Sequence, residues 1–333
     1  MSALVSLAAA CVLAAAALAG AAFPAGRVAL GQVLPILAFL CFVAGVAFRV
    51  LLWARAPVPF RIPTTCGQQK SLPWIRANAV DNPSSGIGTI ARLALEVLFF
   101  RSLFRNTQSE LRPDGRLVYT PSPWLWAGAL AFHGALCVIL LRHLRFFLNP
   151  VPAPLIALQS ADGFFQVALP ALYASTFVFL GGMCFLLGRR LVSASVRYLS
   201  LPQDYFPLFL FLGIVATGLW VHFFEQSTAA PAKELALGLA NLSFARPPAD
   251  LPAVFFAHLL LASVLLAWIP GSKIMHMAGV FLSPTRNLAN NSRAVRHVNP
   301  WNPDVEVHTY AEYEDEFREN MKGAGIPVEK ETK

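Results

Sequence analysis

The sequence is poor in charged residues. Only 13% of its 333 residues are Asp, Glu, Lys or Arg, whereas 56% are hydrophobic; soluble globular domains carry about 25% charged residues. Such a chain has too little polar surface to be solvated by water, which excludes an ordinary soluble protein and makes lipid its expected solvent. The net charge of +8 does not indicate a nucleic-acid partner, because the basic residues stand in loops between apolar runs, as in membrane proteins.

Cysteine is also scarce, with five residues and no C-x-x-C pair. This excludes a c-type haem attachment site, a thioredoxin motif and a run of iron–sulfur ligands in this sequence. Four cysteines stand in apolar runs, where cysteine behaves as a small hydrophobic residue. The fifth, Cys66, lies in a basic segment that favours the thiolate. It is either a redox-active thiol or, in the interpretation we favour, part of a buried contact with a partner subunit.

Six apolar runs each approach the roughly 20 residues that cross a bilayer as a helix. They cover Ala3–Phe23, Gln32–Trp53, Trp124–Phe147, Phe164–Leu187, Tyr205–Phe224 and Pro252 to about Leu282. The sequence therefore predicts an all-α integral membrane bundle. Small residues end the first run as in a signal peptide, but its length and the lack of a preceding Lys or Arg favour a retained helix. We expect an extra N-terminal span over 1–31, a membrane domain over 32–282 with a polar loop at 54–123, and a polar tail over 283–333.

The loops predict the orientation. The loop 54–123 is strongly basic, and the loop between the fourth and fifth runs carries Arg189, Arg190 and Arg197. Basic loops stay in the cytoplasm, so we expect a multi-pass protein of the cytoplasmic membrane with both termini inside. Arg142 and Arg145 are exceptions on the outer side.

Within the basic loop, the segment Ile90–Leu103 is expected to form an amphipathic helix, lying either on the membrane surface or under a partner. Its apolar face carries Leu93, Val97 and Phe100. Its charged residues, Arg92, Glu96 and Arg101, stand elsewhere on the helix.

Five of the seven histidines lie in or at the edge of apolar runs: His133, His143, His222, His258 and His276. An ionisable side chain in lipid is costly and indicates function, although a lone histidine usually serves helix packing.

Four of them are spaced as two pairs. His133 and His143 are ten residues apart, a rise of about 15 Å, and His258 and His276 are eighteen apart, about 27 Å along a straight helix. The two runs are antiparallel, so His143 should face His258 near the outer side and His133 should face His276 near the cytoplasm. Pro270 and Gly271 predict a kink between the last two histidines. This arrangement indicates two b haems, each held by two imidazoles, as an electron path across the membrane.

Two segments resemble a known family. Phe132-His133, a second histidine ten residues on and Asn149-Pro150 resemble the second helix of nitrate reductase gamma subunits, and the run from His258 to Met277 resembles the last helix of that family. The resemblance covers roughly residues 30–282 and leaves the first span as an addition to the five helices of the family. It implies that a quinol is oxidised beside the outer haem.

Three other segments resemble one branch of that family. They are Arg61–Trp74, Leu95–Thr107 and Asn299–Phe317, and they are similar to DsrM, the cytochrome b subunits of the sulfite-reduction-associated DsrMKJOP membrane complex. The resemblance implies exchange of electrons with menaquinone or menaquinol and with a heterodisulfide reductase-like iron–sulfur subunit, DsrK. Chemistry on the thiols or trisulfide of DsrC would then belong to a partner, and this chain would be the quinone-interacting subunit of an oxidoreductase complex.

Quinol oxidation requires proton acceptors. His222, Glu225 and Asp162 stand near outer ends of spans, and we propose His222 and Glu225 for this role; otherwise His222 is an interfacial residue and Glu225 is solvated. The fourth run lacks the lysine that the relatives use here. Arg142 and Arg145 could pair with haem propionates or, as we favour, anchor the span at the interface.

The tail offers no haem ligand, because His297 and His308 are too far from any span. Its stretch from Tyr310 to Phe317 is acidic and aromatic and is expected to dock on a cytoplasmic subunit. Three alternatives remain open: a gamma subunit of a nitrate reductase-type complex, a transporter that uses intramembrane histidines, and a membrane anchor without cofactor. Inverted repeats or matched broken helices would favour the transporter, and the sequence shows neither.

Overall fold

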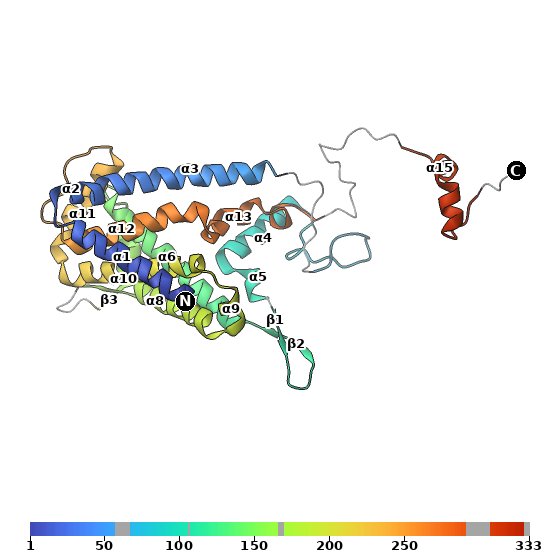
Figure 1. Cartoon of the computed structure of the whole chain (residues 1–333), viewed down its shortest axis with the longest axis horizontal. Coiled ribbons are helices and arrows are strands. Elements are labelled where there is room, and N and C mark those ends of the chain that lie inside the picture. The colour runs from blue at the N-terminus through green and yellow to red at the C-terminus, as the bar shows by residue number, and fades with distance from the viewer. Residues whose placement is uncertain (57–66, 106, 166–169, 291–306, 330–333) are drawn as a thin grey trace.

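Six long apolar helices run side by side in the computed structural model (Figure 1), which describes residues 1–56, 67–105, 107–165, 170–290 and 307–329. Within these residues the candidate membrane spans are Ser2–Gly20, Pro24–Ala54, Pro123–Phe146, Ala174–Val192, Pro202–Phe224 and Ala253–Gly271. The predicted all-α bundle of six spans is confirmed.

Three of the spans are single α-helices: α1 (Ser2–Gly20), α8 (Ala174–Val192) and α10 (Pro202–Phe224). The second span joins α2 (Pro24–Val28), the π-helical η1 (Ala29–Val33) and α3 (Leu34–Ala54). The third joins α6 (Pro123–His143) and the 3-10 turn η2 (Leu144–Phe146). The sixth is α12 (Ala253–Trp268) with the 3-10 turn η4 (Ile269–Gly271).

The last span breaks where Pro270 and Gly271 predicted a kink. After Ser272 the chain continues through η5 (Lys273–Met275) and α13 (His276–Leu282). Proline lacks an amide hydrogen and its ring clashes with the preceding turn of an α-helix, so a regular helix cannot run through this point.

Shorter elements connect the spans. Between the second and third lie α4 (Gly86–Phe99), α5 (Arg101–Phe104) and the antiparallel hairpin of β1 (Thr107–Leu111) and β2 (Leu117–Pro121), with Thr107 opposite Pro121. Between the third and fourth lie α7 (Ala153–Asp162), β3 (Gly163–Phe164) and β4 (Leu172–Tyr173), with Gly163 opposite Tyr173. The remaining elements are α9 (Ala194–Leu199), η3 (Gln226–Thr228), α11 (Ala229–Ala240), α14 (Pro284–Asn287) and α15 (Tyr310–Gly323).

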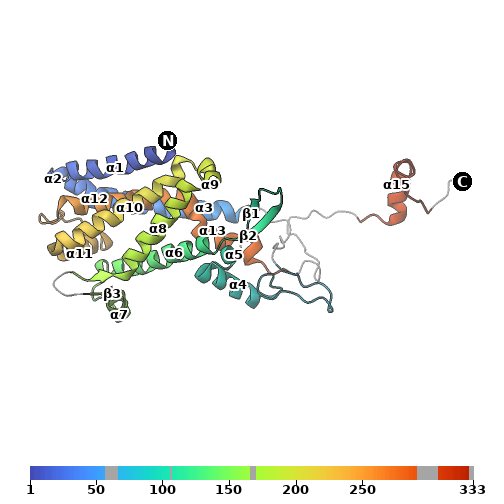
Figure 2. The same ribbon diagram turned by 90° about the horizontal axis from the view of Figure 1, so that it is seen from below.

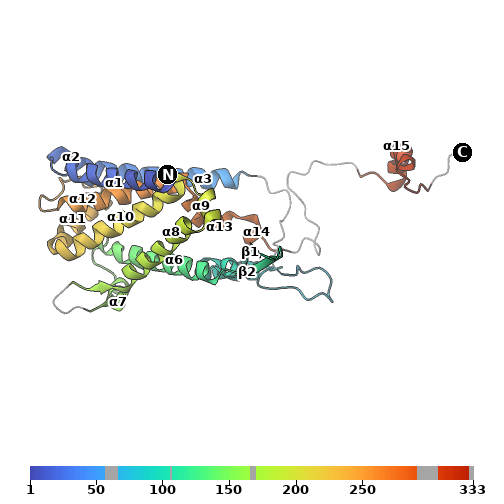
Figure 3. The same ribbon diagram turned by 60° about the horizontal axis from the view of Figure 1, so that its bottom comes forward.

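The connections gather at two ends of the bundle (Figure 3). The segment from α4 to β2 lies with α13 and α14 at one end, which we name the basic end, and α7 and α11 lie at the opposite end. The third and sixth spans traverse the bundle in opposite directions between these ends. His133 and His276 are therefore the histidines nearer the basic end, and His143 and His258 those nearer the opposite end.

The helices pack as two groups (Figure 2). In one, α1, α10 and α3 surround α12; in the other, α6 crosses α8, and α10 contacts both α12 and α8. The second group is centred on Phe132 and Ala135 of α6 with Phe179 and Met183 of α8. A Cβ on Gly182 would lie 3.0 Å from the backbone nitrogen of Phe132, so this glycine permits the close approach of the two helices.

Four of the elements predicted from the sequence have other bounds in the structure. The second span begins at Pro24 and not at Gln32, and the sixth ends at Gly271 and not near Leu282. The fourth span begins at Ala174 and not at Phe164, because Phe164 pairs with Leu172 in the antiparallel strands β3 and β4. The Asp162 carboxylate also accepts the backbone N–H of Ser175 at 2.7 Å. The helix expected over Ile90–Leu103 begins at Gly86 and ends at Phe99, because Phe100 adopts a left-handed φ of 50°.

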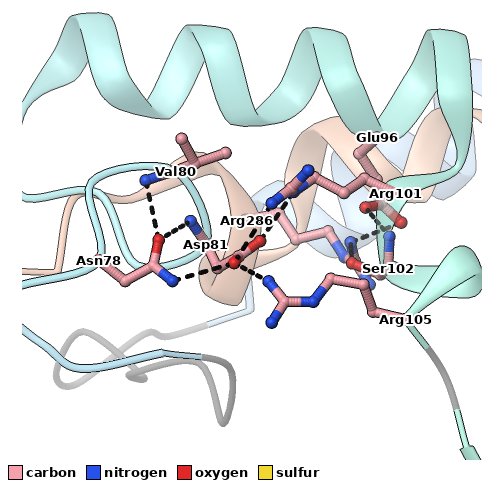
Figure 4. A network of polar contacts seen from close by, with 8 residues as sticks. All are labelled: Asn78, Val80, Asp81, Glu96, Arg101, Ser102, Arg105 and Arg286. Atoms are coloured by element: carbon pink, nitrogen blue, oxygen red, sulfur yellow. Dashed lines mark hydrogen bonds and ion pairs between the residues drawn. The ribbon is translucent and has the colours of Figure 1, made fainter.

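A charge network ties the segment before the third span to the end of the sixth (Figure 4). The Asp81 carboxylate accepts from Arg101 at 2.9 Å and also binds Arg105, while Glu96 pairs with Arg286 of α14 at 2.7 Å. Burial acts to raise the pKa of Asp81, but the hydrogen bonds and charges of the two arginines outweigh it and hold that pKa below its ordinary value. The loop is thus folded onto the bundle by buried charge at neutral pH.

Candidate functional site

The third span and the segment that follows the sixth span bring two of the four histidines close together. The ring centroids of His133 and His276 lie 6.0 Å apart, with their planes 83° apart. Since a metal-bound imidazole nitrogen lies about 2 Å from the metal, two imidazoles on opposite sides of one ion have centroids on the order of 6 Å apart. The spacing of this pair therefore fits a centre with two histidine ligands.

All four histidines share one hydrogen-bonding pattern. In each ring Nδ1 lies within hydrogen-bond distance of a backbone carbonyl, which can only accept, so Nδ1 carries the hydrogen and Nε2 keeps its lone pair. Metal-binding histidines are held and oriented in this way. The acceptors for His133, His143, His258 and His276 are the carbonyls of Ala129, Ile139, Ile214 and Lys273, at 2.8, 2.7, 3.0 and 2.8 Å.

Aromatic side chains line the His133 side of the pair at the basic end. His133 has its ring edge-on to Phe100 and Phe132, with centroids 5.1 and 5.0 Å away, and Phe132 stacks on Phe179 at 4.8 Å. Phe100 belongs to the break between α4 and α5, so the folded loop supplies one wall of the site. Free Nε2 atoms between apolar walls are a chemical environment that fits haem b.

A cavity of about 330 Å³ adjoins His276 at the basic end. Its lining includes Arg49 and Lys273, together with Trp53 and Trp268. Arg49 donates its Nε hydrogen to the carbonyl of Pro270 at 3.0 Å, and Lys273 pairs with an Asp204 oxygen at 2.7 Å. The two cations give this side of the site affinity for carboxylates such as haem propionates.

At the opposite end, α10 forms the surroundings of His258. The Thr217 hydroxyl lies 3.2 Å from Nδ1 of His258, and a Cβ on Gly218 would lie 3.1 Å from Cε1 of the same ring. His143, the last residue of α6, lies at this end of its span. Sequence reasoning missed Thr217 and Gly218, because their role depends on which span packs against His258.

Arg142, next to His143, belongs to a buried polar cluster. Its guanidinium donates to Asp162 at 2.6 Å and to Ser175 at 3.0 Å, and its Cζ lies 3.4 Å from the ring centroid of Tyr173. The side chains of Arg142 and Asp162 are only 12% and 7% exposed. Arg142 is therefore the partner of a buried carboxylate in this structure, whereas interfacial anchoring was the interpretation favoured from the sequence.

Asp162 is the acceptor on which this cluster converges. Besides Arg142 it accepts the backbone N–H and the hydroxyl of Ser175, at 2.7 and 2.6 Å. Burial acts to raise the pKa of Asp162, but the hydrogen bonds from Ser175 and then Arg142 outweigh it and hold that pKa below its ordinary value. Arg145 extends the cluster by donating to the Gln159 side chain at 2.7 Å, and Gln159 donates to the Tyr173 hydroxyl at 3.2 Å.

His222 lies against this cluster. Its Nε2 is 2.9 Å from the carbonyl of Ala171, and its ring centroid is 5.4 Å from that of Tyr173. It stands four residues after Gly218, about 6 Å along the helix, so it is one turn beyond the contact with His258. Because Nε2 of His222 donates to a carbonyl, Nδ1 keeps the lone pair; in the four paired histidines the lone pair is on Nε2. Glu225 follows at the end of α10 and is half-buried.

Other predicted positions lie away from this site or cannot be placed. Cys66 and His297 fall outside the described residues. His308 is exposed just before α15, whose N-terminus is capped by Thr309 and Glu312. The acidic stretch Tyr310–Phe317 is the first part of that helix, and its docking on a cytoplasmic subunit stays a prediction.

Comparison with known proteins identifies one family and two relatives with the same name. The family model for the nitrate reductase gamma subunit matches residues 93–297, a range that includes all four paired histidines. The chain is 41% identical over 279 residues to a protein of Archaeoglobus fulgidus named as the cytochrome b-like subunit of an Hdr-like menaquinol oxidoreductase, covering 82% of this chain and 83% of that one. A protein of the same name from Archaeoglobus profundus is 40% identical over 280 residues, with the same coverage.

Proposed function

The chain belongs to the nitrate reductase gamma subunit family, and from this premise we propose that it is a dihaem cytochrome b subunit of a membrane-bound menaquinol oxidoreductase. The proposed ligands are His133 and His276 for a haem at the basic end and His143 and His258 for a haem at the opposite end. Bound haem would supply one-electron redox chemistry at two depths of the membrane.

The observation that carries this proposal is the shared state of the four histidines. Each has Nδ1 fixed by a backbone carbonyl and Nε2 free; two of them stand on the third span, and two stand on the sixth span and on α13, which follows it. Two imidazoles on one iron leave no open position for oxygen, so such centres transfer electrons. At the basic end, Arg49 and Lys273 would pair with the haem propionates.

The proposed electron donor or acceptor in the membrane is menaquinol or menaquinone. The two Archaeoglobus relatives are named for menaquinol oxidation. Oxidising a quinol releases two electrons and two protons, so bases must stand at the site. We propose Nδ1 of His222 and the carboxylate of Glu225 as the acceptors, beside the pair of His143 and His258.

The proposed electron partner is a cytoplasmic iron–sulfur subunit that resembles heterodisulfide reductase. This chain would be the DsrM-type member of a DsrMKJOP-like complex in dissimilatory sulfur metabolism, passing electrons to or from a DsrK-like subunit. Thiol or trisulfide chemistry on DsrC would take place on that partner. The basic loops support the proposal that both termini lie in the cytoplasm and that the chain lies in the inner membrane.

The deciding experiment is a reduced-minus-oxidised visible spectrum of the purified complex, with pyridine haemochrome quantification of haem b on the isolated subunit. We expect two b haems per chain and a fall to about one when either His143 or His276 is replaced by Ala. His308→Ala is the matched control, because this histidine is exposed and precedes α15.

Either of two results would overturn the proposal: no haem b in the wild-type protein, or a haem content that the two substitutions leave unchanged. A membrane anchor or a histidine-dependent transporter would then be the better account. The family match also supports a gamma subunit of a nitrate reductase-type complex; a molybdenum-containing partner that co-purifies with the chain would favour that alternative over an iron–sulfur partner without molybdenum.

A further inference from the structure

On helix α4 (Gly86–Phe99) the apolar side chains face outward and the polar side chains face inward. Every exposed residue on it is Gly, Ala or a larger apolar residue, and the most exposed are Ile87 at 84%, Ile90 at 68% and Leu98 at 62%. Its polar side chains point the other way: Thr89 and Arg92 are buried. A surface helix of a water-soluble protein shows the reverse arrangement.

The inward polar face is fixed by ionic contacts (Figure 4). Glu96 accepts the backbone N–H of Ser102 at 3.0 Å and pairs with Arg286 at 2.7 Å, and Arg286 also donates to the Ser102 hydroxyl at 2.9 Å. Arg286 belongs to α14, which follows α13 in the segment after the last span. Turning the apolar face inward would break these contacts, so the outward orientation is part of the fold.

The C-terminal end of α4 is attached where the third span begins. The indole N–H of Trp126 donates to the carbonyl of Phe99 at 2.7 Å, and Trp126 is in the first turn of α6. Tryptophan concentrates at the membrane–water interface, and the neighbouring Trp124 is 77% exposed. One attachment of α4 is therefore to the start of a membrane span, where the third span meets the membrane surface, and the other is to the segment that follows the sixth span.

We propose that α4 is an interfacial helix whose apolar face is immersed in the acyl-chain region of the bilayer at the basic end. Its length of about 21 Å suits a helix lying in the plane of the interface. The purely apolar composition favours lipid over a protein partner, because protein interfaces are only about 56–65% apolar and contain hydrogen bonds, whereas the hydrocarbon region excludes polar groups. The helix would hold the loop that carries Phe100 against His133.

Photo-crosslinking in native membranes tests this with the whole complex. p-Benzoylphenylalanine is introduced at Phe99 and, separately, at Ile90; the first exchange preserves an aromatic side chain and so protects folding. Phe48, 66% exposed on α3 within the second span, takes the same label as the reference for a lipid-facing site. After irradiation, mass spectrometry identifies what is attached.

We expect phospholipid adducts at Phe99 and Ile90 at yields within about threefold of that at Phe48. Adducts to another protein subunit at both α4 positions would overturn the proposal and make the face a subunit interface. Absence of any lipid adduct at both positions, with a lipid adduct at Phe48, would overturn it as well.

Discussion

The contact between α10 and His258 gives the sharpest prediction. In Gly218→Ala the new methyl group would lie 3.1 Å from Cε1 and 3.3 Å from Nδ1 of the imidazole. These distances are shorter than ordinary carbon contacts, and overpacking of this kind costs about 1–3 kcal/mol. The ring must shift away from its two acceptors on α10, the Ile214 carbonyl and the Thr217 hydroxyl. If the whole cost falls on the ligand, haem affinity at this site decreases about 5- to 150-fold, at 1.4 kcal/mol for each factor of ten.

The assay is haem b per chain after exchange against an excess of an apo-haem-binding protein, read by pyridine haemochrome. We expect the variant to lose one haem faster than the wild type and to retain the other. Gly181→Ala is the matched control, since a Cβ there meets no heavy atom within 4 Å on the membrane span α8. If Gly218→Ala retains both haems as firmly as Gly181→Ala, then His258 does not hold haem from the position described, and the assignment of the second pair is refuted.

Four further predictions concern titratable groups. Asp162→Asn leaves Arg142 without its buried counter-charge, so unfolding in detergent should occur at lower temperature by the equivalent of about 3–5 kcal/mol, whereas Asp114→Asn in the exposed β1–β2 turn should have little effect. Because the native pKa of Asp162 lies below its unfolded value, its stabilisation is complete at neutral pH and is lost as pH falls through that native pKa; a melting temperature that rises on acidification below pH 4 would contradict this. The pKa of Asp81 is lowered in the same sense, so proteolysis of the loop before the third span should accelerate on acidification and in Asp81→Asn at neutral pH. His222→Ala should retain both haems in the visible spectrum and slow menaquinol oxidation about 100-fold or more, the usual effect of removing a general base; loss of haem would show that the residue has another role.

The sequence predicted what depends on length and hydropathy, and missed what depends on contacts between distant segments. The first, third and fifth spans begin and end close to their expected residues because continuous apolar runs set those limits. The start of the fourth was wrong because Phe164 and its neighbours are apolar enough for a span, and only the pairing of Phe164 with Leu172 in β3 and β4 shows that the chain turns back. Histidine spacing placed His133 with His276, but Thr217 and Gly218 became visible only when α10 was seen against His258.

The break in the last span resolves a mismatch between the two ligand spacings. Ten residues on α6 separate His133 from His143 by about 15 Å, whereas eighteen residues of straight helix would separate His258 from His276 by about 27 Å. Two straight antiparallel helices could match only one of the two pairs in depth, leaving the other about 12 Å out of register. The chain instead leaves the helical path at Ser272, where ψ is 175°, and His276 lies 6.0 Å from His133 between ring centroids.

The second span holds that break in place. Arg49 of α3 donates to the Pro270 carbonyl at 3.0 Å. A Cβ on Gly45, one helical turn earlier, would lie 2.6 Å from the Pro270 ring, so this position of α3 must be glycine for the two segments to approach. The position of His276 thus depends on three features: Gly45 on α3, Pro270 at the end of the sixth span, and the extended backbone at Ser272. A substitution on α3, a span without any of the four paired histidines, should therefore act on the basic-end pair before it acts on the pair at the opposite end.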